Sequence, residues 1–361
     1  MDTSILSNLT DPAILFFFLG LFVGAVRSNL EIPAPIAKFL SLYLLMAIGF
    51  KGGQALGDAG LTGNAVRVVL IALFLALTIP AIGFLVLRRR VNHFDAAAIA
   101  ATYGSVSAVT FIAASQFVTG RGDAPGGYLT VALVLMESPA IIMAVLLATW
   151  ARARQRSVDT AADSLVAAPA GGAQPVGGTA GGPGGPVGEP APAAPAAPLP
   201  MKAILHEAFT DGAHLLLIGS LVIGAVSGPA GGEAMAPFIG DVFKGLLAFF
   251  LLEMGLLVAR QLREVRDVGP FLIGFGIVMP LIGAAMALTL GSIVGLPVGD
   301  LTMLAVLAAS GSYIVVPAVV RYAIPEARPS RYFTMALAVT FPFNIVVGIP
   351  LYYAIAQQVG G

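Results

Sequence analysis

Long apolar runs separated by short polar connections recur along the whole chain. A membrane-spanning helix needs about 20 mostly apolar residues, and ten runs approach or exceed the lower limit for crossing a bilayer. We therefore predict an all-α polytopic membrane protein with ten transmembrane helices. The expected spans are Pro12–Arg27, Pro35–Phe50, Ala65–Leu87, Asp95–Val118, Tyr128–Trp150, Gly212–Ser227, Ala236–Val258, Val268–Gly291, Asp300–Tyr322 and Tyr332–Ala356.

Two small, hydroxyl-rich interruptions fall near the middle of the fourth and ninth spans: Gly104-Ser105-Val106-Ser107 and Ser310-Gly311-Ser312. Glycine weakens a helix, and exposed hydroxyls are unfavourable in hydrocarbon, so a lipid-facing helix gains nothing from these residues. Matched interruptions in corresponding segments indicate the binding site of a secondary transporter. We predict that both helices are discontinuous; close helix packing through small residues is the alternative.

The two halves of the chain resemble each other. Matching anchors are the aspartates Asp11 and Asp211, the lysines Lys38 and Lys244, and the glycines Gly49 and Gly255. Five spans per half is an odd number, so the second repeat should lie upside down relative to the first. The predicted organisation is a five-helix repeat over residues 1–152, a linker over 153–202 and a second five-helix repeat over 203–361.

The composition agrees with a membrane protein. Hydrophobic residues make up 58% of the chain and charged residues 11%, whereas a soluble domain carries roughly 25% charged residues. The net charge is zero, which indicates no nucleic-acid partner, and the absence of cysteine excludes disulfides and thiolate chemistry. No phosphate-binding loop of the Walker type occurs, so we expect an ion gradient to drive transport. No cofactor is expected.

Between Ser157 and Pro200 the sequence consists mainly of Ala, Gly and Pro. Such a segment buries too little apolar surface to offset the entropy of ordering. We predict a disordered tether; a regulatory docking segment is the alternative.

The basic residues predict the orientation. One side collects 14 of the 19, namely Arg27, Arg88, Arg89, Arg90, Arg152, Arg154, Arg156, Lys202, Arg260, Arg263, Arg266, Arg321, Arg328 and Arg331. Cytoplasmic loops carry an excess of Lys and Arg. We therefore expect both termini outside and the central loop in the cytoplasm.

The interruptions predict an anion site. A helix that begins after a break presents free N–H groups and the positive end of its dipole. Small residues let an anion approach, and serine hydroxyls add donors. Carbonyl oxygens at the helix ends before the breaks, with Ser or Thr oxygens, are suited to Na⁺. The predicted anion-binding residues are Gly104, Ser105, Val106, Ser107, Ser310, Gly311 and Ser312.

Carboxylates inside the spans are further candidates. Glu137 lies in the fifth segment next to Ser138 and Pro139, whose missing N–H frees a nearby carbonyl. A carboxylate within the membrane is a functional candidate by default, and Glu137 could bind Na⁺ or carry a proton. An interfacial position near the outer surface is the alternative. Asn344 is the corresponding polar group of the second repeat, and Glu253 is better explained as a structural residue.

Several runs are similar to those of a known family. They are Leu30-Glu31-Ile32-Pro33, Ala37 to Leu45, Ala47 to Gly53, Tyr103 to Phe111 and Ala309 to Ile314. In these runs, and across both halves outside the linker, the chain resembles the sodium-dependent bicarbonate transporter family of cyanobacteria and other bacteria (SbtA type).

The resemblance implies a Na⁺/HCO₃⁻ symporter in the bacterial inner membrane that imports bicarbonate for inorganic carbon uptake. It implies a core domain of helices 3–5 and 8–10, and a scaffold of helices 1, 2, 6 and 7 that forms a homotrimer in the lipid. A small PII-like regulatory protein would dock from the cytoplasm, although the linker does not resemble an ordered docking loop. Na⁺ would lie beside the bicarbonate, with candidate ligands Ser107, Thr110, Glu137, Ser138, Thr340 and Asn344.

Other functions remain open from the residues. The first alternative is an ion-coupled symporter for another small anion, a carboxylate or sulfate; a proton-coupled exchanger would need no Na⁺. An intramembrane hydrolase with Ser105 or Ser107 as nucleophile would need a base, and no His lies in the fourth or ninth span. A structural or receptor-like membrane protein would show no flux. We do not expect an enzyme.

Overall fold

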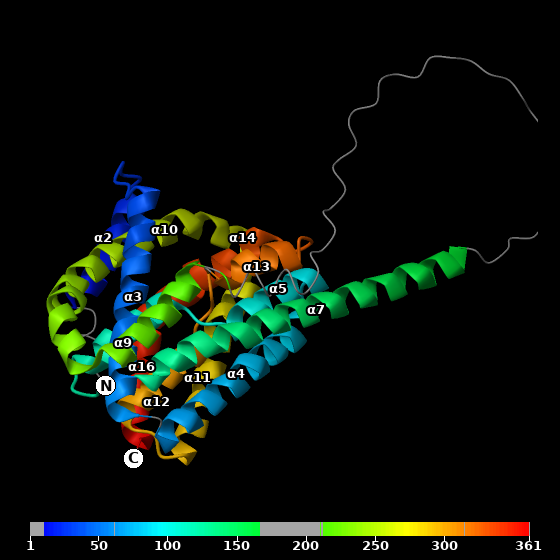
Figure 1. The fold of residues 1–361 in the computed structure, drawn as a ribbon. Helices are drawn as coiled ribbons and strands as arrows, with labels where there is room; N and C mark the ends of the chain where they lie inside the picture. The colour runs from blue at the N-terminus through cyan, green and yellow to red at the C-terminus, as the bar shows by residue number, and fades with distance from the viewer. Residues whose placement is uncertain (1–10, 61, 167–209, 211, 314, 361) are drawn as a thin grey trace, which may run out of the picture.

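The computed structural model describes residues 11–60, 62–166, 210, 212–313 and 315–360. Within these residues the chain folds into helices and contains no strand, which confirms the all-α class (Figure 1). Seven helical stretches are long and apolar enough to cross a membrane: Ala34–Asp58, Gly63–Leu87, His93–Thr119, Tyr128–Arg154, Leu215–Val268, Pro270–Ile293 and Pro329–Val359. Pro12–Ala25 and Val298–Ala308 are shorter apolar helices. The arrangement of ten spans stays a prediction.

The helices of the first half begin at recognisable capping residues. The side chain of Asp11 accepts a hydrogen bond from the amide of Ala13, 2.8 Å away, and Thr62 and Asn92 cap two later helices in the same manner. The helices are α2 (Pro12–Ala25), α3 (Ala34–Ala59), α4 (Gly63–Leu87), α5 (His93–Gly104), α6 (Ala108–Thr119) and α7 (Tyr128–Val166).

The C-terminal end of α7 continues beyond the predicted span and projects from the helical body (Figure 1). Residues 153–166, which we expected in the linker, are therefore helical. The reason lies in the sequence, because proline and glycine reappear only from Pro169 onward. The rest of the predicted linker, 167–202, lies outside the described residues.

The second half contains π-helical segments as well as α-helices. Its elements are α9 (Gly212–Ala236), η1 (Pro237–Asp241), α10 (Val242–Val268), α11 (Pro270–Ile293), α12 (Val298–Ala308), α13 (Val315–Ala323), α14 (Pro329–Thr334), η2 (Met335–Thr340), α15 (Phe341–Phe343), η3 (Asn344–Gly348) and α16 (Ile349–Val359).

The apolar stretch Leu215–Val268 is 54 residues long. At a rise of 1.5 Å per residue a straight helix of this length would extend about 80 Å, far beyond a hydrocarbon core of about 30 Å. The helix is interrupted at Gly228, where φ is 60° and ψ is −167°. The stretch is thus too long for a single crossing.

Two helix pairs pack backbone against backbone. Helix α2 lies along α10, and α3 lies along α9. A Cβ at Gly20 would overlap the carbonyl oxygen of Leu252, and one at Gly53 would overlap that of Leu221. Glycine at these positions therefore allows the close approach that holds helices together in a membrane.

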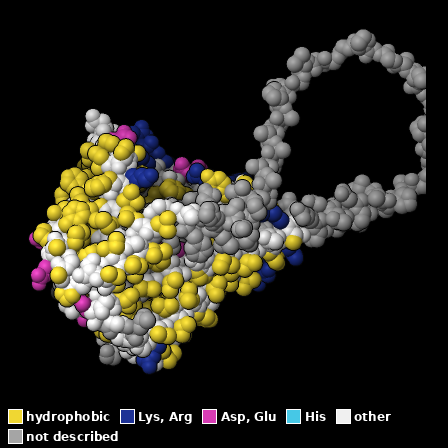
Figure 2. Space-filling view, viewed as in Figure 1, with side chains coloured by type: hydrophobic (Ala, Val, Ile, Leu, Met, Phe, Trp, Pro, Cys, Tyr) yellow, Lys and Arg dark blue, Asp and Glu magenta, His cyan; other side chains and the backbone are white. Residues whose placement is uncertain are grey.

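The interrupted helices occupy the centre of the molecule. Every residue from Asp95 to Gly104 in α5 and from Gly299 to Ala308 in α12 is buried. In contrast, α2 and α4 expose large apolar side chains such as Phe22 and Leu70. Figure 2 shows hydrophobic side chains over most of the visible face of the helical body. Lipid can therefore cover the outer helices, while irregular backbone is confined to the interior, as a membrane requires.

Two buried aspartates anchor the first turns of these inner helices. Asp95 in α5 accepts hydrogen bonds from the amide of Arg328 and the guanidinium of Arg331, both at 2.8 Å. Asp300 in α12 accepts one from the amide of Gly126 at 2.7 Å and one from the hydroxyl of Tyr128. Each aspartate thus ties an interrupted helix to the start of a helix in the other half.

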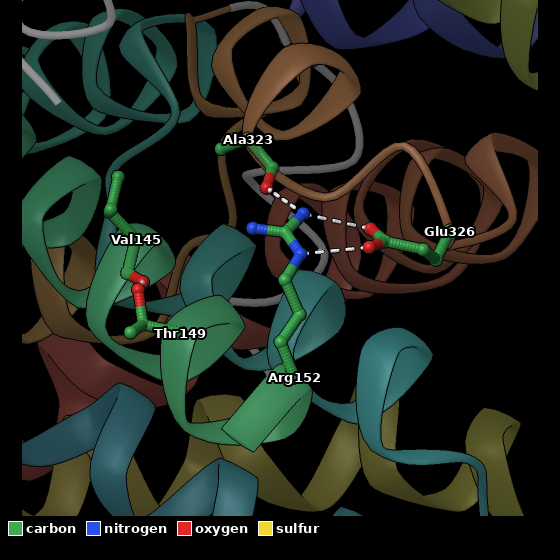
Figure 3. A network of polar contacts seen from close by, with 5 residues as sticks. All are labelled: Val145, Thr149, Arg152, Ala323 and Glu326. Atoms are coloured by element: carbon green, nitrogen blue, oxygen red, sulfur yellow. Dashed lines mark hydrogen bonds and ion pairs between the residues drawn. The ribbon is translucent and has the colours of Figure 1, made fainter. Parts of the chain in front are cut away.

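The ion pair of Arg152 and Glu326 is more exposed than the pair of Asp95 and Arg331 at its acidic partner (Figure 3). The guanidinium donates to both carboxylate oxygens, at 2.8 and 2.9 Å, and to the carbonyl of Ala323 at 2.7 Å. Burial tends to raise the pKa of the Glu326 carboxyl, but the hydrogen bonds from Arg152 outweigh it and leave this pKa below its usual value.

Asp95→Asn should therefore destabilise the protein more than Glu326→Gln. The side chain of Asp95 is 0% exposed, and removing one partner of a buried pair costs about 3 kcal/mol. The Glu326 side chain is 33% exposed, and such pairs contribute less than about 1 kcal/mol. Thermal unfolding of the purified variants in detergent measures the difference. Equal shifts in Tm would contradict the anchoring role of Asp95.

Candidate functional site

The first interruption lies where the sequence predicted it. Helix α5 ends at Gly104, the backbone is extended at Ser105 with φ −101° and ψ 179°, and α6 begins at Ala108. Ser107 is the N-cap of α6, because its hydroxyl oxygen accepts a hydrogen bond from the amide of Thr110 at 3.2 Å. It also accepts from the Thr110 hydroxyl at 2.9 Å. The expected break in the fourth span is confirmed.

The second interruption repeats this design. Helix α12 ends at Ala308 and α13 begins at Val315, with buried residues between Ala309 and Tyr313. The hydroxyl oxygen of Ser312 accepts a hydrogen bond from the amide of Val316 at 3.3 Å. Ser312 lies three residues before α13, so each interruption contains a serine whose hydroxyl accepts a hydrogen bond from an amide of the helix that follows. The expected interruption at Ser310 to Ser312 is therefore present.

Hydrogen bonds join the two interruptions directly. The amide of Ser312 donates to the carbonyl of Thr102 at 2.9 Å, and the amide of Ser107 donates to the hydroxyl of Ser310 at 3.1 Å. Ser310 in turn donates to the carbonyl of Leu307 at 3.0 Å. Backbone groups that lose their helical partners at one break therefore bond to the other break, as buried polar groups must. We call the place where the two interruptions meet the crossing.

A small pocket of about 40 Å³ lies beside this crossing. Ser107, Ser312 and Glu137 line it, so the start of α6, the segment before α13 and the first third of α7 converge on one space. The lining residues are Ser41, Leu45, Val106, Ser107, Ala108, Leu133, Glu137, Ala213, Leu217, Ser312 and Tyr313. The pocket therefore combines two helix N-termini, hydroxyl groups and one carboxylate within an apolar wall.

Glu137 brings a carboxylate into this space from α7. The residue is only 7% exposed, and Pro139 lies two residues further along the same helix. Because proline has no N–H, the carbonyl of Leu135 lacks its usual helical partner. The structure thus places an acidic side chain, on a helix turn that lacks one hydrogen bond, in the same pocket as Ser107 and Ser312.

Ser105 is the other notable residue of the first break. Among the buried side-chain polar atoms of the described residues, its hydroxyl oxygen alone has no hydrogen-bond partner. A buried donor without a partner costs about 1–3 kcal/mol. A polar solute in the crossing would remove that cost, so the residues present fit a bound ion.

Four predicted Na⁺ ligands do not line the pocket, namely Thr110, Ser138, Thr340 and Asn344. The Thr340 hydroxyl bonds to the carbonyl of Gly276 at 2.7 Å and to the Tyr103 hydroxyl at 2.5 Å. The Asn344 amide donates to the carbonyl of Ala309 at 2.8 Å. Asn344 thus braces the backbone at the second interruption, whereas Thr340 links the Tyr103 side chain to α11. Ser138 is half-buried beside Glu137. Their role in binding Na⁺ stays a prediction.

Among the other predicted residues, some line the pocket and others lie in the interruptions without lining it. Val106 lines the pocket, whereas Gly104, Gly311 and Ser310 belong to the crossing behind it. Thr110 reaches the site through its hydrogen bonds to Ser107.

Sequence reasoning missed the wall that faces the interruptions. Ser41 of α3 and Leu217 of α9 close the pocket from the opposite side. Nothing in the apolar pattern distinguishes them, because the face that α3 and α9 turn inward depends on how these helices pack. Tyr313 lines the pocket and also a separate cavity with Arg321 and Glu264.

An all-helical body with apolar outer faces and interrupted inner helices defines a multi-pass membrane protein. The family model of the Na⁺-dependent bicarbonate transporter superfamily matches residues 12–357. The chain therefore belongs to this family, which confirms the resemblance seen in its sequence. No curated protein matches the chain.

Proposed function

We propose that the protein is a symporter that couples bicarbonate import to Na⁺ entry. One observation supports this above all: Ser107 and Ser312, from the two interruptions, and the carboxylate of Glu137 line the same pocket. The proposal joins this geometry to the membership of a Na⁺-dependent bicarbonate transporter family.

The anion would lie at the N-termini of α6 and α13. Free amides and the positive dipole ends of two helices favour a negative charge there. The hydroxyls of Ser107 and Ser312 accept hydrogen bonds from their own helices, so each retains a proton to donate. A water needs roughly 10–15 Å³ of such space, so a pocket of about 40 Å³ suits an anion with few heavy atoms.

Na⁺ would lie on the Glu137 side of the pocket. Hard cations prefer oxygen ligands, and a carboxylate supplies the negative charge that a hydroxyl lacks. The hydroxyls of Ser107 and Thr110, 2.9 Å apart, bring two further oxygens near α7. Binding of the cation next to the anion would make each stabilise the other, which is the basis of symport.

We further propose ten spans in two inverted repeats, with a core of helices 3–5 and 8–10 and a scaffold of helices 1, 2, 6 and 7. The contacts between repeats support it. Gly20 of α2 meets Gly255 of α10, and Ser220 of α9 meets Gly49 of α3. Gly20 and Ser220 lie at corresponding places in the two halves, as do Gly49 and Gly255. The same helix contact therefore occurs twice, with the two halves exchanged. The anchors of Asp95 and Asp300 are exchanged in the same manner.

The proposed orientation has the termini outside and the arginine-rich end in the cytoplasm of a bacterial inner membrane. Its support is the gathering of basic residues at one end of the fold. Arg88 and Arg154 both lie 5.8 Å from the ring of Trp150, and Arg152 and Arg331 form ion pairs with Glu326 and Asp95. The positive-inside rule then gives the sidedness.

A homotrimer and a cytoplasmic PII-like regulator are proposed from the family resemblance. The scaffold helices offer apolar surface for lipid or another copy of the chain, since Phe22 on α2 is 64% exposed and Val226 on α9 is 81% exposed. Import of bicarbonate would then serve inorganic carbon uptake.

The proposal is tested by uptake of labelled bicarbonate into proteoliposomes that contain the purified protein. We expect uptake to require an inward Na⁺ gradient and to continue in excess sulfate or acetate. Uptake that follows a pH gradient without Na⁺ would contradict Na⁺ coupling. Competition by sulfate or acetate would instead favour a symporter for another small anion.

A further inference from the structure

A second, larger cavity of about 360 Å³ lies at the end of the molecule where α7 begins. Gly126 and Gly127, which precede α7, form part of its wall. The arginines Arg152 and Arg154 lie near the other end of the same helix. The cavity therefore opens opposite the arginine-rich end, on the proposed outer side.

The cavity continues the helix faces that line the site pocket. On α3, Leu45 lines the pocket and Ile48, one turn later, lines the cavity. On α6, Ala108 lines the pocket and Phe111 the cavity. On α7, Thr130 lines the cavity, and Leu133, one turn later, lines the pocket. Residues three or four apart share a helix face. The cavity therefore leads along three helices to Ser107 and Ser312.

Apolar side chains separate the two spaces. Ile48 and Phe111 are buried, with exposures of 7% and 3%. They form the inner end of the cavity, one helical turn before the site pocket. A solute would have to displace or pass these side chains to reach the serines.

Two lysines line the cavity. Lys51 of α3 is half-buried, and its Nζ lies 4.8 Å from the centre of the Phe243 ring. Lys244 of α10 is exposed in the same cavity. Neither forms an ion pair within the part of the chain that the structure describes. Asp241 is the one carboxylate among the lining residues, so positive charge is in excess.

The rest of the polar lining consists of neutral groups. The side chains of Ser115, Gln116, Thr119 and Thr130 can donate hydrogen bonds to an oxyanion. A charged side chain within a membrane span is costly and marks an ion pathway. A cavity with low-dielectric walls and one sign of charge also raises the local concentration of the opposite ion.

We propose that this cavity is an entry site for bicarbonate, in which Lys51 and Lys244 attract the anion and hold it before it passes Ile48 and Phe111. The inference rests on the proposed function, since it gives the bicarbonate its route to Ser107 and Ser312. It adds a second, weaker oxyanion site that the interruptions do not supply.

Single-cysteine variants test the role of the charge, because the chain contains no cysteine of its own. Lys51→Cys and Lys244→Cys should each raise the bicarbonate concentration for half-maximal uptake by about 3- to 10-fold, because each removes one of the two positive charges of a cleft whose full field contributes about tenfold or more. The maximal rate should change little. Modification with a trimethylammonium-ethyl methanethiosulfonate should return the value toward that of the wild type. A sulfonate-ethyl reagent should raise it further.

Lys38→Cys provides the matched control. Lys38 is exposed at the start of α3 and does not line the cavity, so neither its replacement nor either reagent should change uptake. Ala55→Cys controls for a thiol within the cavity, because Ala55 lines the cavity but has no side-chain donor that the substitution would remove. Size-exclusion profiles in detergent establish that each variant folds, and Lys51→Arg should retain the wild-type value.

The outcomes separate the two claims. Absence of Na⁺-dependent bicarbonate uptake by the wild type would overturn the proposed function and the entry site together. Normal uptake by the wild type with unchanged half-maximal concentrations in Lys51→Cys and Lys244→Cys would overturn the entry site alone. Equal effects of the cationic and anionic reagents would also overturn it.

Discussion

Ser107→Ala and Ser312→Ala should each reduce the apparent affinity for bicarbonate by about ten- to a hundredfold. A hydrogen bond to a charged group contributes about 1.5–3 kcal/mol, and each serine would lose one to the anion. Each would also lose the hydrogen bond that it accepts from the amide of Thr110 or of Val316, which reduces the stability of the protein by about 1 kcal/mol. Initial rates of Na⁺-dependent uptake over a range of bicarbonate concentrations measure the effect.

Thr289→Ala is the matched control for these serine variants. The Thr289 hydroxyl bonds to the carbonyl of Ala285 in its own helix at 2.7 Å and is exposed on α11. Its loss should leave uptake unchanged. Wild-type affinity in both Ser107→Ala and Ser312→Ala, at equal expression, would refute the assignment of the anion to the helix N-termini.

Glu137→Gln should strongly reduce the Na⁺-dependent uptake of bicarbonate. The carboxylate is 7% exposed in the pocket, and the amide keeps its shape but removes the negative charge that offsets the cation. A loss of at least about tenfold in uptake is expected, because a hydrogen-bonded charge in a buried site contributes more than about 1.5 kcal/mol. Uptake of labelled Na⁺ and of bicarbonate, measured in the same preparation, tests whether both fluxes are lost together.

Glu253→Gln separates this role from the general effect of a buried carboxylate. Glu253 on α10 is also 7% exposed but does not line the site pocket. We expect its variant to retain Na⁺-dependent uptake, with any loss limited to stability. If Glu137→Gln kept normal Na⁺ dependence, or if both variants lost it equally, Glu137 would not be the cation ligand.

The local features of the site could be predicted because they depend on residue type alone. Glycine and serine in the middle of an apolar run weaken the helix wherever it packs, and the structure interrupts the chain at both places. Glu137 was identifiable for a similar reason, since a carboxylate within an apolar run is unfavourable without a role. The seven long apolar helices likewise follow from hydropathy.

Features that depend on packing could not be predicted. The inward position of Ser41 is set by the contact of α3 with α9, and a single serine in an apolar run does not indicate which face is buried. Lys51 shows the same limit, because its cavity exists only once α3, α6, α7 and α10 are assembled. Thr340 was a candidate through the family resemblance, whereas its position in the structure follows from hydrogen bonds to Tyr103 and Gly276.

The central claim is that an anion binds where α6 and α13 begin, and a structure determined by cryo-electron microscopy in Na⁺ and bicarbonate tests it most directly. We predict density for a small anion within hydrogen-bonding distance of the Ser107 and Ser312 hydroxyls, with a cation toward Glu137. Bound bicarbonate away from both serines, or unbroken helices through residues 104–107 and 309–314, would contradict the account.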